Sequence, residues 1–459
     1  GYRDMIYLNL TARNDWSSTL PDGENSLFYP AASLGLEFTE MLGISDNDIL
    51  PYGKLRVSYG QVGNDAPLYA TSNYFAQTAV TGDGFTDGLV FPILGQNAFE
   101  QDGVLGNNEL RPETTTTFEV GVDLRFFNNR LGLDVTYYNA ETVDQILPVD
   151  ISAGSGFLSS VQNAGLVTNE GIEAVINATP VEAGSFRWDT RFNFTAYENI
   201  VETILPDLTN IFLAGFTSTS SRAIEGEPYG TLFGGGFQRV EDESSPYFDE
   251  LIIGADGFPL TATESKILGD PNPDWILGVS NTFSYKGLSL SALVDIRQGG
   301  DVWNGTYGIG QYFGVTQHSA DYRGELGDGV IYQGVQETES GEFVPNTQQV
   351  DMNNDDVGTG SNRWVRYGFG TLGEENVEDA SWVRLREVRL AYSLPNALTD
   401  NLGVSAVDLA LTGRNLLLFT GYRGIDPETN LTGTGNGFGL DYFNNPNTRG
   451  YGVSLNVTF

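Results

Sequence analysis

Apolar and polar residues alternate with a period of two along much of this chain, and this pattern limits the fold more than any other feature. Successive side chains of a β-strand point to opposite faces, so the pattern predicts strands with one apolar and one polar face. In the final segment the apolar positions are Val453, Leu455, Val457 and Phe459. The chain is therefore expected to be all-β.

The length of the alternating segments narrows the choice of β architecture. Each is about ten residues long, which is the length that a tilted strand needs to cross a bilayer. A soluble β-sandwich shows the same alternation, but here the polar positions repeatedly carry Arg, Asp and Glu, which suits a wet or plugged lumen. We place strands at 2–12, 29–38, 52–60, 114–127, 130–140, 166–179, 186–198, 274–285, 288–298, 381–392, 403–415 and 449–459.

The connections between these segments fall into two classes by length. Asn128-Asn129 and Lys286-Gly287 are two-residue hairpin turns. Long structureless loops are unusual in compact soluble domains, whereas outer-membrane barrels have short turns on one side and long loops on the other. We therefore predict a transmembrane antiparallel β-barrel with long extracellular loops. These loops are expected at 61–113, 141–165, 199–273, 299–380 and 416–448.

The direction of the strands provides a consistency test. If Asn128-Asn129 is periplasmic, Lys286-Gly287 and the connection 393–402 fall on the same side, and the last strand runs toward the periplasm with Phe459 at its end. We expect this last strand to close the barrel against a first strand outside this chain. Residues 229–238 look like a further strand, and parity allows none or two additional strands there. We expect twelve to fourteen barrel strands.

One predicted strand changes phase along its length. Val383 and Leu385 are apolar at odd positions, whereas Val388 is apolar at an even position. An extra residue in a strand shifts the alternation in this way. We therefore predict a β-bulge near Arg386-Glu387.

Composition excludes several classes of function. The net charge of −37 argues against nucleic-acid binding, which needs clustered Lys and Arg. The acidity is explained by solvated loops, or by an acidic surface or lumen that favours neutral or cationic cargo. The chain has no Cys, which excludes a disulfide scaffold and a cysteine nucleophile. It has no run of about 18 apolar residues, so no transmembrane helix is expected.

Several short motifs lie in order along the chain. They are 163–173 (NAGLVTNEGIE), 269–275 (GDPNPDW), 281–287 (NTFSYKG), 299–301 (GGD), 380–386 (ASWVRLR), 392–395 (YSLP), 414–416 (RNL) and 424–428 (GIDPE). Asp426-Pro427 favours a tight turn, and Gly299-Gly300 allows a sharp exit from a strand. Taken together, the motifs resemble those of the SusC/RagA family of TonB-dependent outer-membrane transporters. We interpret them as features that build the barrel rather than cargo contacts.

The resemblance implies that 1–459 is the C-terminal part of one barrel domain of about 22 strands, with the plug domain, TonB box and first strands upstream. The start at Gly1, almost inside a strand pattern, is what a piece of a longer protein would show. The implied function is TonB-dependent import of oligosaccharides or peptides across the outer membrane of a Gram-negative, Bacteroidota-type bacterium. Implied partners are a SusD-like lid lipoprotein, TonB through the N-terminal region, outer-membrane lipid and a second transporter–lid pair in a homodimer.

Two rival hypotheses stay open from the sequence. One is a complete, passive, porin-like barrel of twelve strands. The other is a secreted β-rich adhesin or binding protein, whose strands would show the same alternation. Within the leading hypothesis, glycan and peptide cargoes both remain possible, because the motifs describe the barrel and the cargo is read by loops.

Aromatic residues crowd the longest predicted loop, 299–380. Exposed rings in such a loop can stack on sugar faces or peptide side chains, or contact a lid protein. The alternative is that they pack the loop onto itself or form part of the aromatic girdle. The candidates for cargo or lid contact are Trp303, Tyr307, Tyr312, Phe313, Trp364 and Tyr367.

Catalytic and metal motifs are sparse. His318 is the only histidine and lies in a loop without a motif, and no nucleophile elbow, Walker loop or zinc-protease motif occurs. We expect no enzyme activity and no cofactor. Asp351, Asn353 and Asp355 occupy positions one, three and five of a calcium-type loop, but the usual Gly and Glu are missing from its sixth and twelfth positions. A solvated acidic loop is therefore favoured over a calcium site.

Overall fold

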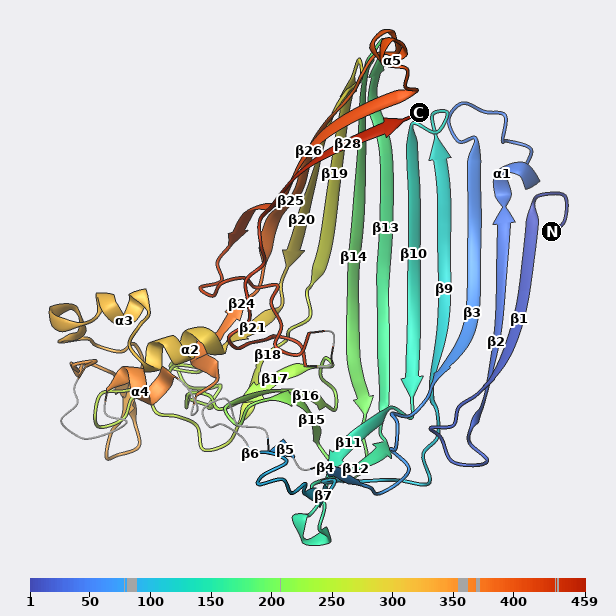
Figure 1. The fold of residues 1–459 in the computed structure, drawn as a ribbon. Helices are drawn as coiled ribbons and strands as arrows, with labels where there is room; N and C mark the ends of the chain where they lie inside the picture. Colours follow the sequence, from blue (N-terminus) through green and yellow to red (C-terminus); the bar gives the residue numbers. More distant parts are fainter. Residues whose placement is uncertain are drawn as a thin grey trace.

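Twelve antiparallel strands form one sheet in the computed structural model (Figure 1). They match the twelve predicted positions, so the predicted fold class and strand number are confirmed. The structure describes residues 1–77, 79–80, 89–206, 208–353, 362–368, 372–433, 435 and 437–459. In sheet order, the strands are β1 (Ile6–Trp16), β2 (Ser26–Glu37), β3 (Tyr52–Asn64), β9 (Glu113–Phe126), β10 (Leu131–Val143), β13 (Leu166–Ala183), β14 (Phe186–Thr203), β19 (Trp275–Tyr285), β20 (Leu288–Gln298), β25 (Trp382–Ser393), β26 (Ala406–Thr420) and β28 (Gly450–Thr458).

The strand register gathers the apolar positions on one face of the sheet. Leu290 of β20 lies opposite Leu390 of β25, and Leu390 lies opposite Leu411 of β26. Leu411 in turn lies opposite Val453 of β28. Directly opposed residues share a face, and these four side chains are all exposed. The result is the continuous apolar surface that a lipid-facing barrel wall needs.

The opposite face carries charged and polar side chains. Arg56 of β3 donates to Asp134 of β10 at 2.9 Å. Arg187 and Asp189 of β14 pair with 2.7 Å between Nε and Oδ2. Arg56, Asp134 and Arg187 each lie between two apolar neighbours, and Asp189 is two residues from Arg187, so all four point away from the apolar face. This arrangement agrees with the predicted polar lumen.

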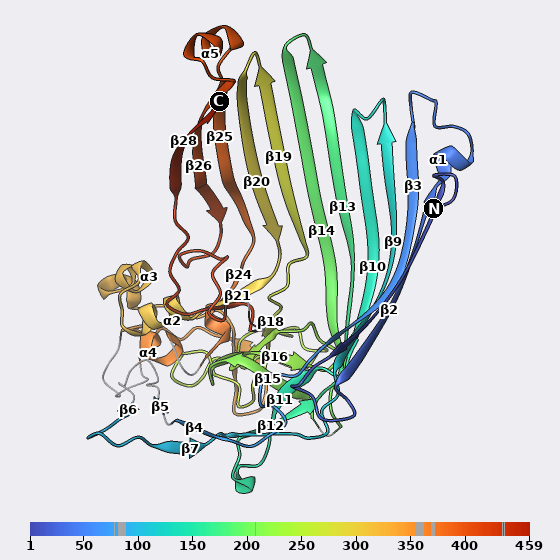
Figure 2. The ribbon, with the colours of Figure 1, turned by 45° about the vertical axis from the view of Figure 1, so that its right-hand side comes forward.

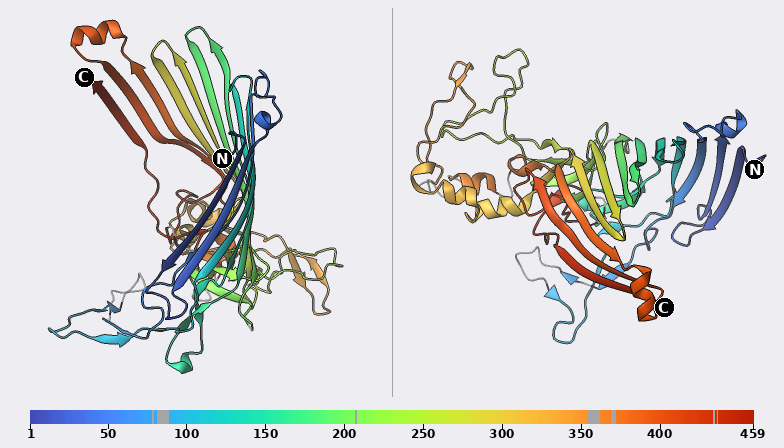
Figure 3. Two further views of the ribbon diagram at one scale, coloured as in Figure 1. Left: turned by 90° about the vertical axis from the view of Figure 1, so that its right-hand side faces the viewer. Right: turned by 90° about the horizontal axis from the view of Figure 1, so that it is seen from above.

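The sheet is open in this chain. β1 and β28 are its two ends, and within the described sheet β1 pairs only with β2 and β28 only with β26. Figures 2 and 3 show these two strands on opposite sides of a curved wall. The arrangement therefore leaves two long strand edges without partners.

Short and long connections lie at opposite edges of the sheet (Figure 1). The turns 127–130 and 286–287, helix α5 (Asn396–Leu402) and the C-terminal end of β28 share one edge. Asn128, Asn129 and Lys286 adopt positive φ values of 56°, 66° and 45°, as tight hairpin turns require. The predicted strand directions are therefore correct. The long connections at the other edge, which we call the loop edge, are 17–25, 65–112, 144–165, 204–274, 299–381 and 421–449.

The strand-like stretch 229–238 adds no strand to the barrel wall. It contains β17, which belongs to a separate four-stranded sheet at the loop edge. This outcome selects twelve from the expected range of twelve to fourteen. The sheet consists of β15 (Asn210–Gly215), β16 (Thr219–Ile224), β17 (Thr231–Gly234) and β18 (Lys266–Gly269).

The predicted β-bulge is present in β25. Glu387 pairs with Leu293 and Leu385 with Val294, so Arg386 is the extra residue between them. The register with β26 shifts at the same place. The bulge keeps the apolar positions on one face along the whole strand.

Smaller elements complete the loop edge, apart from α1 (Phe38–Met41), which lies near the short turns. Among the described residues, no helix combines the length and apolar character needed to cross a membrane. The short strands are β4 (Phe75–Gln77), β5 (Ala79–Val80), β6 (Leu89–Val90), β7 (Phe99–Gln101), β8 (Val104–Leu105), β11 (Ile146–Asp150), β12 (Ser159–Asn163), β21 (Asp301–Asn304), β22 (Val335–Glu337), β23 (Phe343–Pro345), β24 (Val377–Asp379) and β27 (Leu440–Asp441). The helices are α2 (Gly305–Tyr312), α3 (Gln317–Asp321), α4 (Arg363–Gly368), η1 (Ala153–Ser155), η2 (Gly324–Gly327) and η3 (Glu374–Asn376).

Candidate functional site

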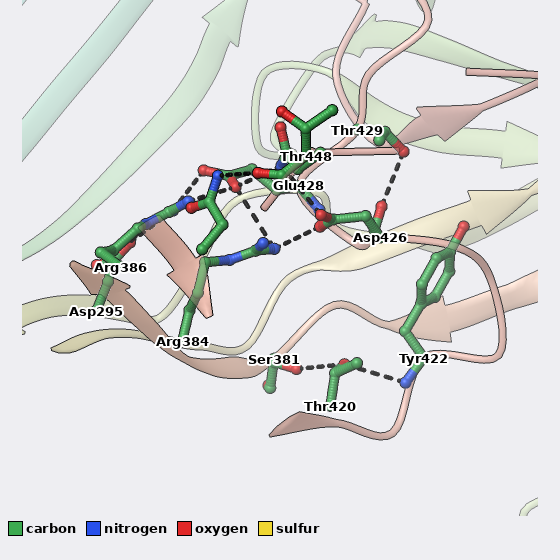
Figure 4. Close-up of polar contacts among 12 residues, drawn as sticks. Asp295, Ser381, Arg384, Arg386, Thr420, Tyr422, Asp426, Glu428, Thr429 and Thr448 are labelled. Atoms are coloured by element: carbon green, nitrogen blue, oxygen red, sulfur yellow. Dashed lines mark hydrogen bonds and ion pairs between the residues drawn. The ribbon is translucent and has the colours of Figure 1, made fainter. Parts of the chain in front are cut away.

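An ionic network joins the barrel wall to the connection 421–449 (Figure 4). Arg384 of β25 donates to Asp426 at 2.5 Å and lies 3.5 Å from Glu428. The side chains of Arg384 and Asp426 are only 3% and 5% exposed. Two buried opposite charges in hydrogen-bonding contact stabilise each other, and removal of either would leave the other uncompensated.

Arg386, the bulged residue, extends the network to a second wall strand. It donates to Asp295 of β20 from Nη2 at 2.7 Å and to Glu428 from Nη1 at 2.7 Å. The carboxamide of Asn447, near the other end of the connection, donates to both Asp426 and Glu428 at 3.0 Å. Both ends of the connection 421–449 are thus held on the inner side of the wall.

The turn predicted at Asp426-Pro427 is present. The N–H of Thr429 donates to the carbonyl of Asp426 at 3.1 Å, and the N–H of Glu428 donates to the Asp426 carboxylate at 3.0 Å. Asp426 therefore shapes the turn and also binds Arg384. The sequence motifs 380–386 and 424–428 meet here, a contact that the sequence analysis did not predict.

The motif at 163–173 fastens three chain segments at the loop edge. The Asn163 carboxamide donates to the carbonyls of Arg111 and Asp144 at 2.7 and 2.8 Å, and it accepts from the N–H of Arg111 at 2.9 Å. Gly165 follows with a φ of +80°, and a Cβ there would lie 2.3 Å from the carbonyl oxygen of Thr203. This motif has a structural role, as we predicted.

The motif at 299–301 has a similar role at β20. Gly299 and Gly300 both adopt positive φ, so the chain leaves the wall sharply as predicted. Asp301 then contacts the motif 269–275, because its carboxylate accepts from the N–H of Asp270 at 3.0 Å. The Ala380 N–H donates to the Gly300 carbonyl at 2.8 Å. The contacts hold together the roots of two long connections.

Three of the six aromatic candidates are buried within this chain. Trp303, Trp364 and Tyr367 are 1%, 7% and 1% exposed. The Trp364 indole donates to the Asn353 side chain at 2.9 Å, and the Tyr367 hydroxyl donates to the Pro259 carbonyl at 2.5 Å. Burial raises the pKa of Tyr367. In this chain these rings pack the loop region onto itself.

The other three aromatic candidates lie nearer the surface. The ring of Tyr307 is half-buried beneath the Arg423 guanidinium, 4.5 Å from its centroid. Tyr312 and Phe313, at the end of α2, form an edge-to-face pair at 5.1 Å and are 38% and 62% exposed. Cargo or lid contact stays a prediction for all six residues.

The calcium hypothesis falls partly outside the described residues, because Asp355 is not among them. Asp351 is exposed, and its carboxylate accepts from the N–H of Asn353 at 2.9 Å. The Asn353 carboxamide is engaged by protein partners, since it donates to the Tyr322 carbonyl at 2.8 Å and accepts from Trp364. The calcium candidate is therefore untested, and a solvated acidic loop stays the prediction.

His318 lies on α3 between two aromatic rings. Its ring meets those of Tyr322 and Trp364 edge to face at 5.1 and 5.4 Å, and its Nδ1 lies 3.3 Å from Gln311. Burial and the charge of Arg363 lower the pKa of His318, which favours the neutral ring. These contacts show that His318 packs the loop region.

Known proteins are similar to this chain in sequence and in the arrangement of its strands. Residues 3–231 match the family model described as TonB dependent receptor-like, beta-barrel. Over this stretch the chain is a TonB-dependent receptor-like β-barrel domain. TonB-dependent receptor P26 of Formosa agariphila is 30% identical over 100% of this chain and 45% of the relative, and TonB-dependent receptor P3 of the same organism is 28% identical over 100% and 44%. TonB-dependent receptor SusC of Bacteroides thetaiotaomicron is 24% identical over 91% and 39%.

A solved structure shares the fold of this receptor barrel. The RagAB peptide transporter superposes with a TM-score of 0.71 at 22% identity, covering 100% of this chain and 46% of that chain. The family model and the curated relatives together confirm the resemblance to SusC/RagA-type TonB-dependent receptors that the motifs predicted. The chain spans less than half the length of the curated relatives that it matches.

Proposed function

We propose that the protein to which this chain belongs imports a bulky nutrient across the outer membrane of a Gram-negative, Bacteroidota-type bacterium, with energy from TonB. The observation that carries this proposal is the twelve-stranded wall with one apolar face, one charged face and two edges without partners in this chain. Such a wall suits part of a larger lipid-embedded barrel, because open sheet edges do not occur in the hydrocarbon core. The match to the TonB-dependent receptor-like β-barrel model supports the same conclusion.

The same features weigh against the rival hypotheses. A complete passive barrel of twelve strands would pair β1 with β28, which do not pair here. A secreted β-rich protein would bury its apolar faces, whereas Leu411, Val453 and Leu455 are 51%, 73% and 63% exposed. The proposed partners are a SusD-like lid lipoprotein at the loop edge, TonB acting through a region outside this chain, and a second transporter–lid pair.

Three measurements on the full-length protein test the proposal. We expect it in the outer-membrane fraction, with heat-modifiable migration in detergent gels. Uptake should require both TonB and the protein's TonB-interacting segment, and a surface lipoprotein should copurify. Uptake that persists without TonB would exclude active import, and unchanged migration on heating would exclude a membrane barrel.

A further inference from the structure

The segment 442–446, within the connection 421–449, is held firmly at one end by a buried carboxylate. Asp441 is 2% exposed and accepts hydrogen bonds from the hydroxyls of Tyr422 at 2.7 Å and Thr306 at 3.2 Å. The Thr306 oxygen in turn accepts from the N–H of Phe443 at 2.7 Å. The backbone at Phe443 is therefore fixed to helix α2.

Packing and the ionic network fix the rest of the segment. The ring centroid of Tyr442 lies 4.7 Å from that of Phe216 and 6.3 Å from that of Trp303. The planes of Tyr442 and Trp303 differ by 13°, so these two rings are stacked. At the other end, Asn447 donates to Asp426 and Glu428 in the network at the wall. A segment anchored at both ends loses little further conformational freedom when it binds a ligand.

Phe443 is displayed to solvent in a disfavoured conformation. Its side chain is 60% exposed and its φ is +54°, a region that bulky residues rarely adopt. Local contacts hold this conformation. The N–H of Tyr442 donates to the side-chain carbonyl of Asn444 at 3.1 Å, and the Phe443 ring meets the Tyr442 ring edge to face at 4.8 Å. An exposed ring held in a strained conformation by surrounding contacts is typical of a binding position.

The chemistry of the segment indicates the kind of ligand. Residues 442–448 (YFNNPNT) contain no charged side chain, in a chain with 60 acidic and 23 basic residues. The exposed side chain of Asn445 supplies a carboxamide, which both donates and accepts hydrogen bonds. A cationic peptide would find no carboxylate in this segment, and the nearby carboxylates of Asp426 and Glu428 are paired with Arg384 and Arg386. An anionic cargo would find no Lys or Arg in the segment. An apolar ring beside a carboxamide suits a neutral ring that carries hydroxyl groups.

We propose that residues 442–446 form a glycan-recognition segment, in which Phe443 stacks on the ring of a neutral sugar and Asn445 binds its hydroxyls. The site lies on the connection 421–449 at the loop edge, which is tied to the wall through Asp426 and Asn447. This inference rests on the proposed import function, and it selects glycan over peptide as the cargo class.

The test uses the full-length protein purified in detergent together with any lipoprotein that copurifies. Affinity electrophoresis through gels containing β-glucan, galactomannan or xylan measures sugar binding, and calorimetry with a casein digest measures peptide binding. We expect at least one polysaccharide to retard the wild type, and Phe443→Ala to weaken its binding at least about tenfold. Phe443→Trp should bind as the wild type does. Phe99→Ala is the matched control, since that ring is 65% exposed on β7 and is not a candidate contact.

The other outcomes overturn the inference. The inference fails if the wild type binds none of the three polysaccharides, or if casein-peptide binding depends on Phe443. It also fails if Phe443→Ala loses its lipoprotein but keeps sugar binding. A separate TonB-dependent uptake assay distinguishes the two proposals. If Phe443→Ala leaves uptake unchanged, the sugar site is overturned and the import proposal is unaffected. If sugar binding depends on Phe443 but no TonB-dependent uptake occurs, the import proposal is overturned and the sugar site is unaffected.

Discussion

The buried pair between Arg384 and Asp426 makes a quantitative prediction. Asp426→Asn preserves the side-chain volume and an acceptor for the Glu428 N–H, but it leaves the Arg384 guanidinium, 3% exposed, without its main counter-charge. Breaking a buried pair from one side costs about 3–5 kcal/mol. Because Glu428 stays 3.5 Å from Arg384, we expect the lower end, about 3 kcal/mol.

Native-state hydrogen exchange on the full-length protein measures this loss where it occurs. A local cost of about 3 kcal/mol should lower protection at the amides of Glu428 and Thr429 by about a hundredfold. The amides of β22, which is not part of the network, should be unchanged. Arg414→Gln is the matched control, because its pair with Glu387 is exposed (70% and 34%) and is worth at most about 1 kcal/mol.

A double-mutant cycle provides the refutation. Replacing both partners, as in Arg384→Met with Asp426→Leu, removes two buried charges together and should cost less than the two single changes added. Strict additivity, or a change of less than about threefold in exchange for Asp426→Asn, would show that the connection 421–449 is not held by these charges.

The remaining predictions concern the loop edge and the wall. Burial tends to raise the pKa of Glu374, but hydrogen bonds from Lys266 and Arg239 outweigh it and hold that pKa below 4.5. The ionised carboxylate therefore stabilises the loop edge above pH 4.5, and this stabilisation is lost as the pH falls through the lowered pKa. Protease resistance of the loop edge should fall on acidification in the wild type and much less in Glu374→Gln. Asn163→Ala removes three hydrogen bonds to Arg111 and Asp144 and should destabilise this part of the loop edge by about 1–3 kcal/mol. Hydrogen exchange at the Arg111 amide measures the loss, and an unchanged exchange rate would contradict the anchoring role of Asn163. Leu455→Lys places a charge on the apolar face and should cost about 2–4 kcal/mol if the residue lies near the bilayer midplane, which would lower the heat-modifiable folded fraction. Ser454→Lys, on the other face, should be tolerated. Equal effects of the two changes would show that the faces are assigned wrongly.

The wall of this protein could be predicted from the sequence because its determinants are local. A period of two in apolar residues is a property of each strand alone, and it was sufficient to place all twelve strands and the bulge at Arg386. Turn residues such as Asn128 and Lys286 adopt the positive φ of tight hairpins. Strand direction then follows from counting.

The loop edge was decided by the tertiary structure, because its contacts join residues far apart in the chain. Arg384 and Asp426 are 42 positions apart, and neither motif alone indicates its partner. Trp303 and Tyr367, predicted as candidate contacts, are almost fully buried, whereas Phe443, which was not among the predicted contacts, is exposed. A strand's pattern shows which face is apolar, whereas irregular connections have no period, so the burial of their side chains depends on which distant segments they meet.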